Sequence, residues 1–235
     1  MQLIKPFLKS IRRSFRAPAP EIVRAVRADS LTFLEPEALS DLFEMIENYE
    51  RNDMPGILIE AGCAAGGSSI VMAKAKSKQR PLHVYDVFGM IPPPSENDDK
   101  DVHDRYLVIR AGRAKGIGNR TYYGYEENLV AKVEKNFERH GVPLRQNNIQ
   151  LIQGMFQDTL QVAEPVLLAH IDGDWCESVR VCLERISPAL VSGGALVIDD
   201  YDAWSGCRKA VDDFFADKHD RFDFVKKSRL HIIRH

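Results

Sequence analysis

The fold is decided by one stretch of the chain, Gly56-Ile57-Leu58-Ile59-Glu60-Ala61-Gly62-Cys63-Ala64-Ala65-Gly66-Gly67-Ser68-Ser69. Its first residues are apolar and predict a buried strand, and its glycines predict a turn. The residues from 68 to 75 predict a helix with a serine cap. A strand, a glycine turn and a helix form the opening unit of a doubly wound α/β domain. Ligands in such domains bind at the carboxyl ends of the strands, so we expect a binding site at this turn.

The turn has the pattern Glu60-x-Gly62-x-x-x-Gly66-Gly67, which differs from the G-x-G-x-x-G dinucleotide fingerprint. An acid here would repel a pyrophosphate but suits a cationic ligand, and S-adenosylmethionine is cationic at its sulfonium and has no phosphate. The turn resembles motif I of the class I S-adenosylmethionine-dependent methyltransferases. The alternative is a glycine loop that only packs a helix on the sheet. The cofactor-binding residues expected in this stretch are Glu60, Gly62, Gly66, Ser68 and Ser69.

Strands and helices alternate along the rest of the chain, which predicts a doubly wound, mostly parallel sheet of seven strands. The other six strands are expected at residues 82–86, 149–152, 166–172, 195–198, 222–225 and 230–233, the last two as a hairpin at the sheet edge. Helices are expected at residues 31–49, 126–140, 177–190 and 205–215.

Length and composition fit one such domain with extra segments. A net charge of −2 over 235 residues argues against a nucleic-acid partner held by bulk electrostatics. The four cysteines form no C-x-x-C pair, which disfavours a zinc or redox motif and fits a reducing, cytoplasmic setting. No apolar stretch is long enough to span a bilayer. We expect an N-terminal arm with cap helices over residues 1–50 and an S-adenosylmethionine-dependent methyltransferase domain over 51–235.

Residues 1–16 combine apolar and basic side chains at helical spacing, which predicts a basic amphipathic helix. This segment lacks the apolar core and cleavage site of a signal peptide. Such a helix could attach to a membrane surface or pack on its own domain or on a second subunit. We favour packing, because it is the commoner use of such helices, and we expect a homo-oligomer.

Asp86 ends the second strand about 20 residues beyond the glycine turn, where an acid binds the ribose diol in nucleotide-binding folds. We therefore expect Asp86 to bind the cofactor ribose; a solvated acid at a strand end is the alternative. Phe88 follows the same strand, and Gly154 and Phe156 follow the third strand. A glycine and aromatic rings at these positions could cover the adenine ring.

Residues 89–128 lose the periodicity of helices and strands and contain three consecutive prolines and several glycines. Long irregular segments inside compact domains are typically lids or disordered, and we expect a lid insertion here. Tyr122, Tyr123 and Tyr125 lie near its end. They either stack on a substrate or anchor the lid, and the sequence leaves both possibilities open.

Three carboxylates stand at strand ends: Asp172 after the fourth strand, and Asp199 and Asp200 after the fifth. Asp172 is also expected among the cofactor-binding residues. The first, fourth and fifth strands are neighbours in this topology, so these acids converge on the expected cleft. Oxygen ligands without His or Cys suit Mg²⁺. Asp199 and Asp200 can both face inward only if the chain turns directly after Ile198, because successive strand residues point to opposite faces. The alternative is a group of solvated acids that repel one another.

Several segments together resemble the macrocin O-methyltransferase (TylF-type) family. The segments are residues 169–175, 198–201 and 204–211, with the Glu60 turn, residues 86–89 and residues 154–160. Because that family methylates sugar hydroxyls of natural products and glycans, the resemblance implies an S-adenosylmethionine-dependent O-methyltransferase. It also implies Mg²⁺ bound by Asp172, Asp199 and Asp200. The catechol O-methyltransferase group has a lysine three residues after its metal-binding aspartate, where this chain has Trp175. This difference argues against catechol chemistry by that mechanism.

The expected reaction is in-line transfer of the sulfonium methyl group to one hydroxyl of a vicinal diol held by the metal. Asp172, Asp174 and His140 are the candidate bases, and the sequence does not choose between them. Two alternatives stay open: methylation of a phenolic or catechol-like diol, and a catalytically silent scaffold that binds the cofactor. An NAD-dependent reductase is disfavoured because the G-x-G-x-x-G pattern is missing.

Overall fold

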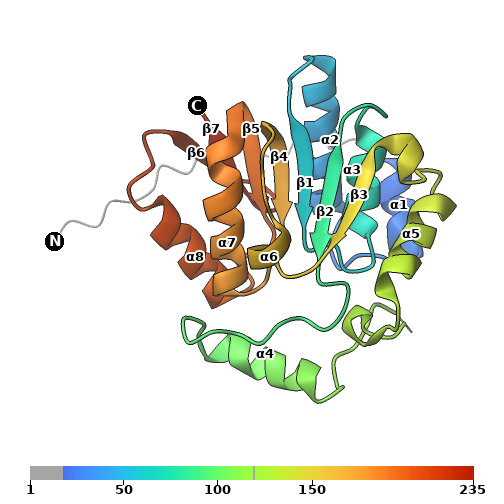
Figure 1. The fold of residues 1–235 in the computed structure, drawn as a ribbon, viewed down its shortest axis with the longest axis vertical. Helices are drawn as coiled ribbons and strands as arrows, with labels where there is room; N and C mark the ends of the chain where they lie inside the picture. The colour runs from blue at the N-terminus through green and yellow to red at the C-terminus, as the bar shows by residue number, and fades with distance from the viewer. Residues whose placement is uncertain (1–17, 119) are drawn as a thin grey trace.

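The computed structural model describes residues 18–118 and 120–235, so the basic helix predicted at residues 1–16 lies outside the described residues. A seven-stranded sheet forms the centre, with the order β3-β2-β1-β4-β5-β7-β6 (Figure 1). The first five strands are parallel, and β7 is antiparallel to β5 and to β6. This arrangement confirms the predicted fold class and the hairpin at the sheet edge. The strands are β1 (Ile57–Ala61), β2 (Leu82–Asp86), β3 (Ile149–Gln153), β4 (Val166–Ile171), β5 (Leu190–Ile198), β6 (Phe222–Lys226) and β7 (Leu230–Arg234).

Two separate apolar cores cover the two faces of the sheet. One core includes side chains from α1 (Glu21–Ala28), α2 (Pro36–Arg51), α3 (Gly67–Ala75) and α5 (Leu129–Arg139). The other includes side chains from α7 (Cys176–Ile186) and α8 (Ser205–Phe215), and the short α6 (Phe156–Thr159) contacts α7. None of the helices in residues 18–118 and 120–235 has the length and apolarity that a membrane crossing requires.

The central strands are apolar throughout because both of their faces are covered by helices. All residues of β1 and β4 are buried. Along β1, Leu58 points into the first core, whereas Ile57 and Ile59 point into the second. Successive side chains alternate between the two faces, so Glu60 shares the face of Leu58. This places one acid inside the layer between the sheet and the first group of helices.

The structure corrects two predicted element ends and adds one helix. The serine cap is wrong, because Gly66 occupies the N-cap of α3 with a φ of 90° and no side chain caps the helix. The chain also forms α1, which the sequence did not predict. Finally, Pro188 ends the α7 region in a 3₁₀ turn, so that Leu190 begins β5 rather than ending a helix.

The segment 89–128 is only partly irregular, which corrects the prediction of a structureless lid. It contains α4 (Lys100–Arg110) and the 3₁₀ helix η1 (Tyr123–Tyr125). Val102 and Ile109 of α4 are buried in a small third core that includes Trp175. Figure 1 shows α4 crossing the molecule beyond the carboxyl ends of β1 and β2. The segment therefore has its own packing and its own helix.

The beginning of this segment is attached to the amino ends of two helices. Asp98 accepts a hydrogen bond of 2.8 Å from the backbone N–H of Cys176, at the start of α7. Asp101 accepts one of 3.0 Å from the backbone N–H of Ser205, at the start of α8. The indole of Trp175 donates to the Pro92 carbonyl at 3.0 Å. Because helix amino ends attract carboxylates, these contacts anchor the first half of the lid.

We expect Asp98→Ala to release this anchor. Asp98 is 6% exposed, and its loss would leave a buried N–H of α7 without its acceptor, at a cost of about 1–3 kcal/mol in the free energy of unfolding. Hydrogen exchange should accelerate over residues 95–110. Asp104→Ala is the matched control, because that acid lies on the exposed side of α4 and pairs with Lys100. Equal protection in both variants would contradict the anchor.

Candidate functional site

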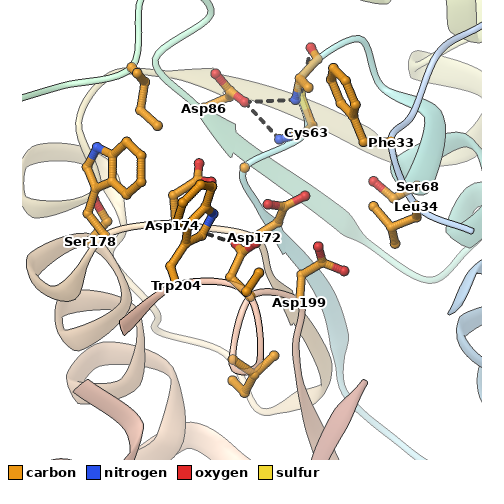
Figure 2. Close-up of a pocket in the computed structure, with 18 of the residues that line it drawn as sticks. Phe33, Leu34, Cys63, Ser68, Asp86, Asp172, Asp174, Ser178, Asp199 and Trp204 are labelled. Atoms are coloured by element: carbon orange, nitrogen blue, oxygen red, sulfur yellow. Dashed lines mark hydrogen bonds between the residues drawn. The ribbon is translucent and has the colours of Figure 1, made fainter. Parts of the chain in front are cut away.

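A cavity of about 540 Å³ opens at the carboxyl ends of the central strands. This volume lies in the range of small-molecule sites, which is roughly 300–1,000 Å³. Its walls come from the glycine turn, the ends of β2, β4 and β5, the segment before α2 and the lid. Figure 2 shows acidic side chains from three of these walls converging on the same space. The position agrees with the crevice where doubly wound folds bind ligands.

The backbone of the glycine turn is in direct contact with the backbone at the end of β4. Gly62 has a φ of 91°, and a Cβ on it would lie 1.9 Å from the carbonyl oxygen of Asp172. Only glycine fits both conditions. The backbone N–H of Asp172 also donates to the carbonyl of Ala61 at 2.9 Å. The first turn after β1 and the first acid after β4 therefore have fixed relative positions.

Asp86 accepts hydrogen bonds from three backbone amides, two of which belong to the glycine turn. Its Oδ2 accepts hydrogen bonds from Cys63 N (2.8 Å) and Ala64 N (3.1 Å), and its Oδ1 accepts one from Phe88 N (2.7 Å). Figure 2 shows the two bonds to the turn as dashed lines. Burial raises the pKa of Asp86, and the amide bonds oppose that rise. The carboxylate lines the cavity as predicted for a ribose ligand, but part of its bonding capacity already shapes the turn.

The residues predicted to bind the cofactor divide into two groups. Five of them line the cavity, namely Gly62, Ser68, Asp86, Phe156 and Asp172. The other five do not line it, namely Glu60, Gly66, Ser69, Phe88 and Gly154. Phe88 has a φ of 48° and packs in the first core, so it does not cover a ligand ring.

Glu60 is buried in a chain of charged groups beneath the cavity. Its Oε1 accepts a hydrogen bond from Ser68 Oγ at 2.6 Å and lies 3.1 Å from Nδ1 of His170. Glu60 and His170 are direct partners across β1 and β4. The other ring nitrogen of His170 lies 3.6 Å from Asp199 Oδ1. Burial disfavours the imidazolium, but the two carboxylates outweigh it and raise the pKa of His170 to about 10. Glu60 therefore faces a cation of the protein itself rather than the cavity.

Three acids form a cluster at the cavity floor. One carboxylate oxygen from each of Asp172, Asp174 and Asp200 lies within 4.8 Å of the others. Asp174 has a φ of 53°, and its backbone N–H donates to Asp200 at 3.2 Å. Burial and mutual repulsion raise the pKa of Asp172 and Asp200 well above the ordinary value, and that of Asp174 to about 7. Such a cluster is stabilised by a hard divalent cation, which fits an all-oxygen donor set.

Asp199 differs from its predicted arrangement with Asp172 and Asp200. The chain does turn after Ile198, as required for both acids to reach the cavity. Asp199 Oδ1, however, accepts a hydrogen bond of 2.6 Å from Arg229 Nε and faces His170. Although burial opposes ionisation, these two cations hold the pKa of Asp199 below its usual range. In this structure Asp174, rather than Asp199, is the third member of the cluster.

His140 is not brought to the cavity, which corrects its prediction as a base. It follows the last residue of α5, and its Nε2 lies 3.2 Å from an oxygen of Asp29. The structure separates the three tyrosines of residues 122–125. Tyr122 and Tyr123 line the cavity, whereas the hydroxyl of Tyr125 donates to the carbonyl of Ile109 at 2.6 Å and anchors the lid.

Four lining features were missed by sequence reasoning: the segment 32–35, Arg105, Trp204 and Arg229. Trp204 stands edge to face against Trp175, with ring centroids 5.8 Å apart. Phe33 is 51% exposed beside the glycine turn, which is unusual for a large apolar side chain. In the sequence, Phe33 near the start of a predicted helix is only a weak signal of a binding site. Arg105 and Arg229 belong to no sequence pattern that indicates one.

Comparison with known proteins gives consistent matches. Residues 28–224 match the family model described as "Macrocin-O-methyltransferase (TylF)". The chain is 33% identical over 190 residues to an 8-demethyl-8-(2,3-dimethoxy-alpha-L-rhamnosyl)-tetracenomycin-C 4'-O-methyltransferase of Streptomyces olivaceus, covering 78% of this chain and 67% of the relative. It is 28% identical over 195 residues to a demethyldecarbamoylnovobiocin O-methyltransferase of Streptomyces niveus, covering 80% and 69%.

Solved structures extend the comparison to the fold. The O-methyltransferase NovP superimposes with a TM-score of 0.70 at 25% identity, over 87% of this chain and 82% of NovP. The calicheamicin methyltransferase CalS11 shares the fold, with a TM-score of 0.60 at 16% identity, over 96% of this chain and 98% of CalS11.

The charged chain beneath the cavity predicts a pH dependence of stability. The folded-state pKa of His170 is raised from 6.5 to about 10, so its contribution is fully present below pH 6.5 and is lost as the pH rises toward 10. Over this window the free energy of unfolding of the wild type should fall more steeply than that of His170→Gln. His103→Gln, at an exposed position of α4, should follow the wild type. Parallel curves for the wild type and His170→Gln in denaturant titrations would contradict the prediction.

Proposed function

From the premise that this chain belongs to the macrocin O-methyltransferase (TylF) family, we propose that it methylates a sugar hydroxyl with S-adenosylmethionine as the methyl donor. Family membership makes the chain an O-methyltransferase. The single observation that carries the finer proposal is the meeting, in one cavity, of the glycine turn with a cluster of three acids. The turn forms the side of the cavity that would bind the methyl donor, called the donor side. The acids form the side that would bind the hydroxyl to be methylated, called the acceptor side.

The donor side suits a cationic cofactor. Gly62, Ser68, Asp86 and Phe156 line this part of the cavity. An acidic cavity favours the sulfonium, and the free lone pairs of Asp86 can accept hydrogen bonds from a ribose diol. The glycine turn lets the backbone approach the ligand closely. S-adenosylmethionine supplies the electrophilic methyl group in this proposal.

The acceptor side suits Mg²⁺. Asp172 and Asp200 belong both to the set predicted from the sequence and to the cluster found in the structure, so we assign them as the direct ligands. Mg²⁺ is usually held by one or two carboxylates, with waters or substrate completing its shell. When bound, the ion would orient a vicinal diol and lower the pKa of the hydroxyl that reacts. Asp199 would join the set only by turning away from Arg229.

Asp174 is the base in this mechanism. It lies beside the two assigned ligands and lines the cavity next to Trp175 and Trp204. The acceptor oxygen attacks the methyl carbon, a C–O bond forms as the C–S bond breaks, and the hydroxyl proton passes to the Asp174 carboxylate. The fixed contact between Gly62 and Asp172 holds donor and acceptor sides together, which supplies the orientation that such a transfer needs.

A sugar acceptor is supported by the names of the relatives and by the shape of the cavity. One relative acts on a rhamnosyl group of a tetracenomycin, and another is named a mycinamicin III 3''-O-methyltransferase. The acceptor wall includes the half-buried ring of Trp204, against which a sugar ring can pack, and Trp204 is itself supported by the buried ring of Trp175. A phenolic or catechol-like diol is the second candidate, but Trp175 occupies the place of the lysine base of catechol chemistry.

The first test of this function concerns the donor. Asp86→Ala should weaken binding of S-adenosylmethionine at least tenfold, because charge-assisted hydrogen bonds are worth roughly 1.5–3 kcal/mol each. The same change loosens the glycine turn, which acts in the same direction. Isothermal titration calorimetry measures the affinity, with Asp213→Ala on the exposed side of α8 as control. An affinity equal to that of the wild type would remove Asp86 from the donor site.

The second test concerns the metal. A ligand that binds only the folded state stabilises it by mass action, by about 2.7 kcal/mol at a hundredfold excess over Kd. Excess Mg²⁺ should therefore raise the melting temperature of the wild type, and EDTA should abolish both this shift and methyl transfer. Asp172→Asn and Asp200→Asn should lose the shift, whereas Asp199→Asn should keep most of it. A silent scaffold would bind the cofactor and Mg²⁺ without methylating any glycoside. Full activity in EDTA would exclude the metal.

A further inference from the structure

The lid helix α4 carries an arginine on its inward face. Val102 and Ile109 are 0% and 1% exposed and mark the side of α4 that faces the body of the protein. Arg105 follows Val102 by three positions and precedes Ile109 by four, so it lies on the same side of the helix. It also lines the cavity. A guanidinium on an inward helix face is costly to bury unless something satisfies its charge.

No carboxylate of the described residues satisfies it. Within residues 18–118 and 120–235, the guanidinium of Arg105 has neither a hydrogen bond nor an ion pair, and its Cζ lies 5.8 Å from the ring centre of Tyr122. Arg229, the other arginine of the cavity wall, differs: Asp199 accepts from it at 2.6 Å and Glu35 at 2.9 Å. Arg229 is therefore neutralised by the protein, whereas the N–H donors of Arg105 remain available.

The helix that carries Arg105 is anchored near the acceptor side. Asp101, one helical turn earlier, is bonded to the start of α8, which anchors this end of α4. The guanidinium lies over the ring of Tyr122, a buried residue of the cavity wall. A cation held by the fold needs little reorganisation to receive a ligand, so binding retains most of its interaction energy.

Building on the proposed function, we propose that Arg105 binds an anionic group of the acceptor, so that the substrate is a sugar bearing a phosphate, a diphosphate or a carboxylate. A guanidinium forms paired hydrogen bonds with each of these groups. The acids at the floor repel an anion, so the charged group lies at the lid and the reacting hydroxyl lies at Asp174. Arg105 and the acid cluster thereby orient the acceptor from its two ends.

The test measures binding rather than turnover. Calorimetry is performed on the full chain with S-adenosylhomocysteine and EDTA, so that no metal ion recruits an anion to the acid cluster. Four probes separate the sources of charge: methyl glucoside (neutral), methyl glucuronide (carboxylate), glucose 1-phosphate and UDP-glucose. The wild type should bind at least one anionic probe tenfold or more tightly than the neutral one, and this preference should weaken as salt is added.

Arg105→Gln should abolish the preference, and Arg110→Gln should keep it, because Arg110 is an exposed cation on the same helix. Matching melting temperatures verify that both variants fold. Two results would overturn the proposal. The first is a wild type that binds no anionic probe more tightly than the neutral one, a result that does not depend on any variant. The second is an Arg105→Gln variant that keeps the preference for anionic probes. Failure of the proposed function is a separate result, namely no binding of S-adenosylmethionine and no methylation of any hydroxyl acceptor.

Discussion

The close approach of Gly62 to Asp172 is the constraint on which the site depends. The space between them admits no side chain, since a Cβ would lie 1.9 Å from a carbonyl oxygen. Backbone bonds continue this contact across the sheet, from Asp172 N to the carbonyl of Ala61 and from Asp199 N to the carbonyl of Ile171. The glycine turn and the acids are thus joined by main chain rather than by flexible side chains. Methyl transfer requires reacting atoms held near their final distance, and main-chain contacts give the most rigid support for that.

Charge compensation divides the acids of this region into two layers. In the first layer, Glu60 beneath the cavity and Asp199 in its wall face the cations His170 and Arg229, so this layer is balanced by the protein itself. At the cavity floor, Asp172 and its two cluster partners form no ion pair with a cation of the described residues, and burial together with nearby carboxylates raises the pKa of each. The balanced layer is fitted to hold the sheet and the turn in place. The unbalanced layer is fitted to receive a positive ligand.

The sequence predicted what depends on local pattern. Alternating apolar strands and helices gave the sheet, and β2 and α8 have their predicted bounds. It missed α4, because the prolines before this helix and the charges within it obscure a stripe of only a few apolar residues. It also misjudged where side chains point. Phe88 turns into the core through a left-handed backbone, and Asp199 is drawn away by Arg229, a residue 30 positions later in the chain. Such a long-range ion pair leaves no trace in local spacing.

The two sides of the cavity come from different parts of the fold. In the proposed function, one part holds the reacting groups and the other selects the acceptor. The donor side and the acids belong to strand ends that are fixed by the sheet. The proposed acceptor wall belongs to segments outside the sheet, namely α4, η1 and the residues around Trp204, which are joined to the body by the small third core and by Asp98 and Asp101 at two helix amino ends. Segments outside the sheet can vary while the reacting groups stay in place. In this chain the wall outside the sheet includes Arg105, which faces inward from α4. The floor at the strand ends consists of the acids Asp172, Asp174 and Asp200. The opposite charges that line the cavity therefore come from parts of the fold that can change independently.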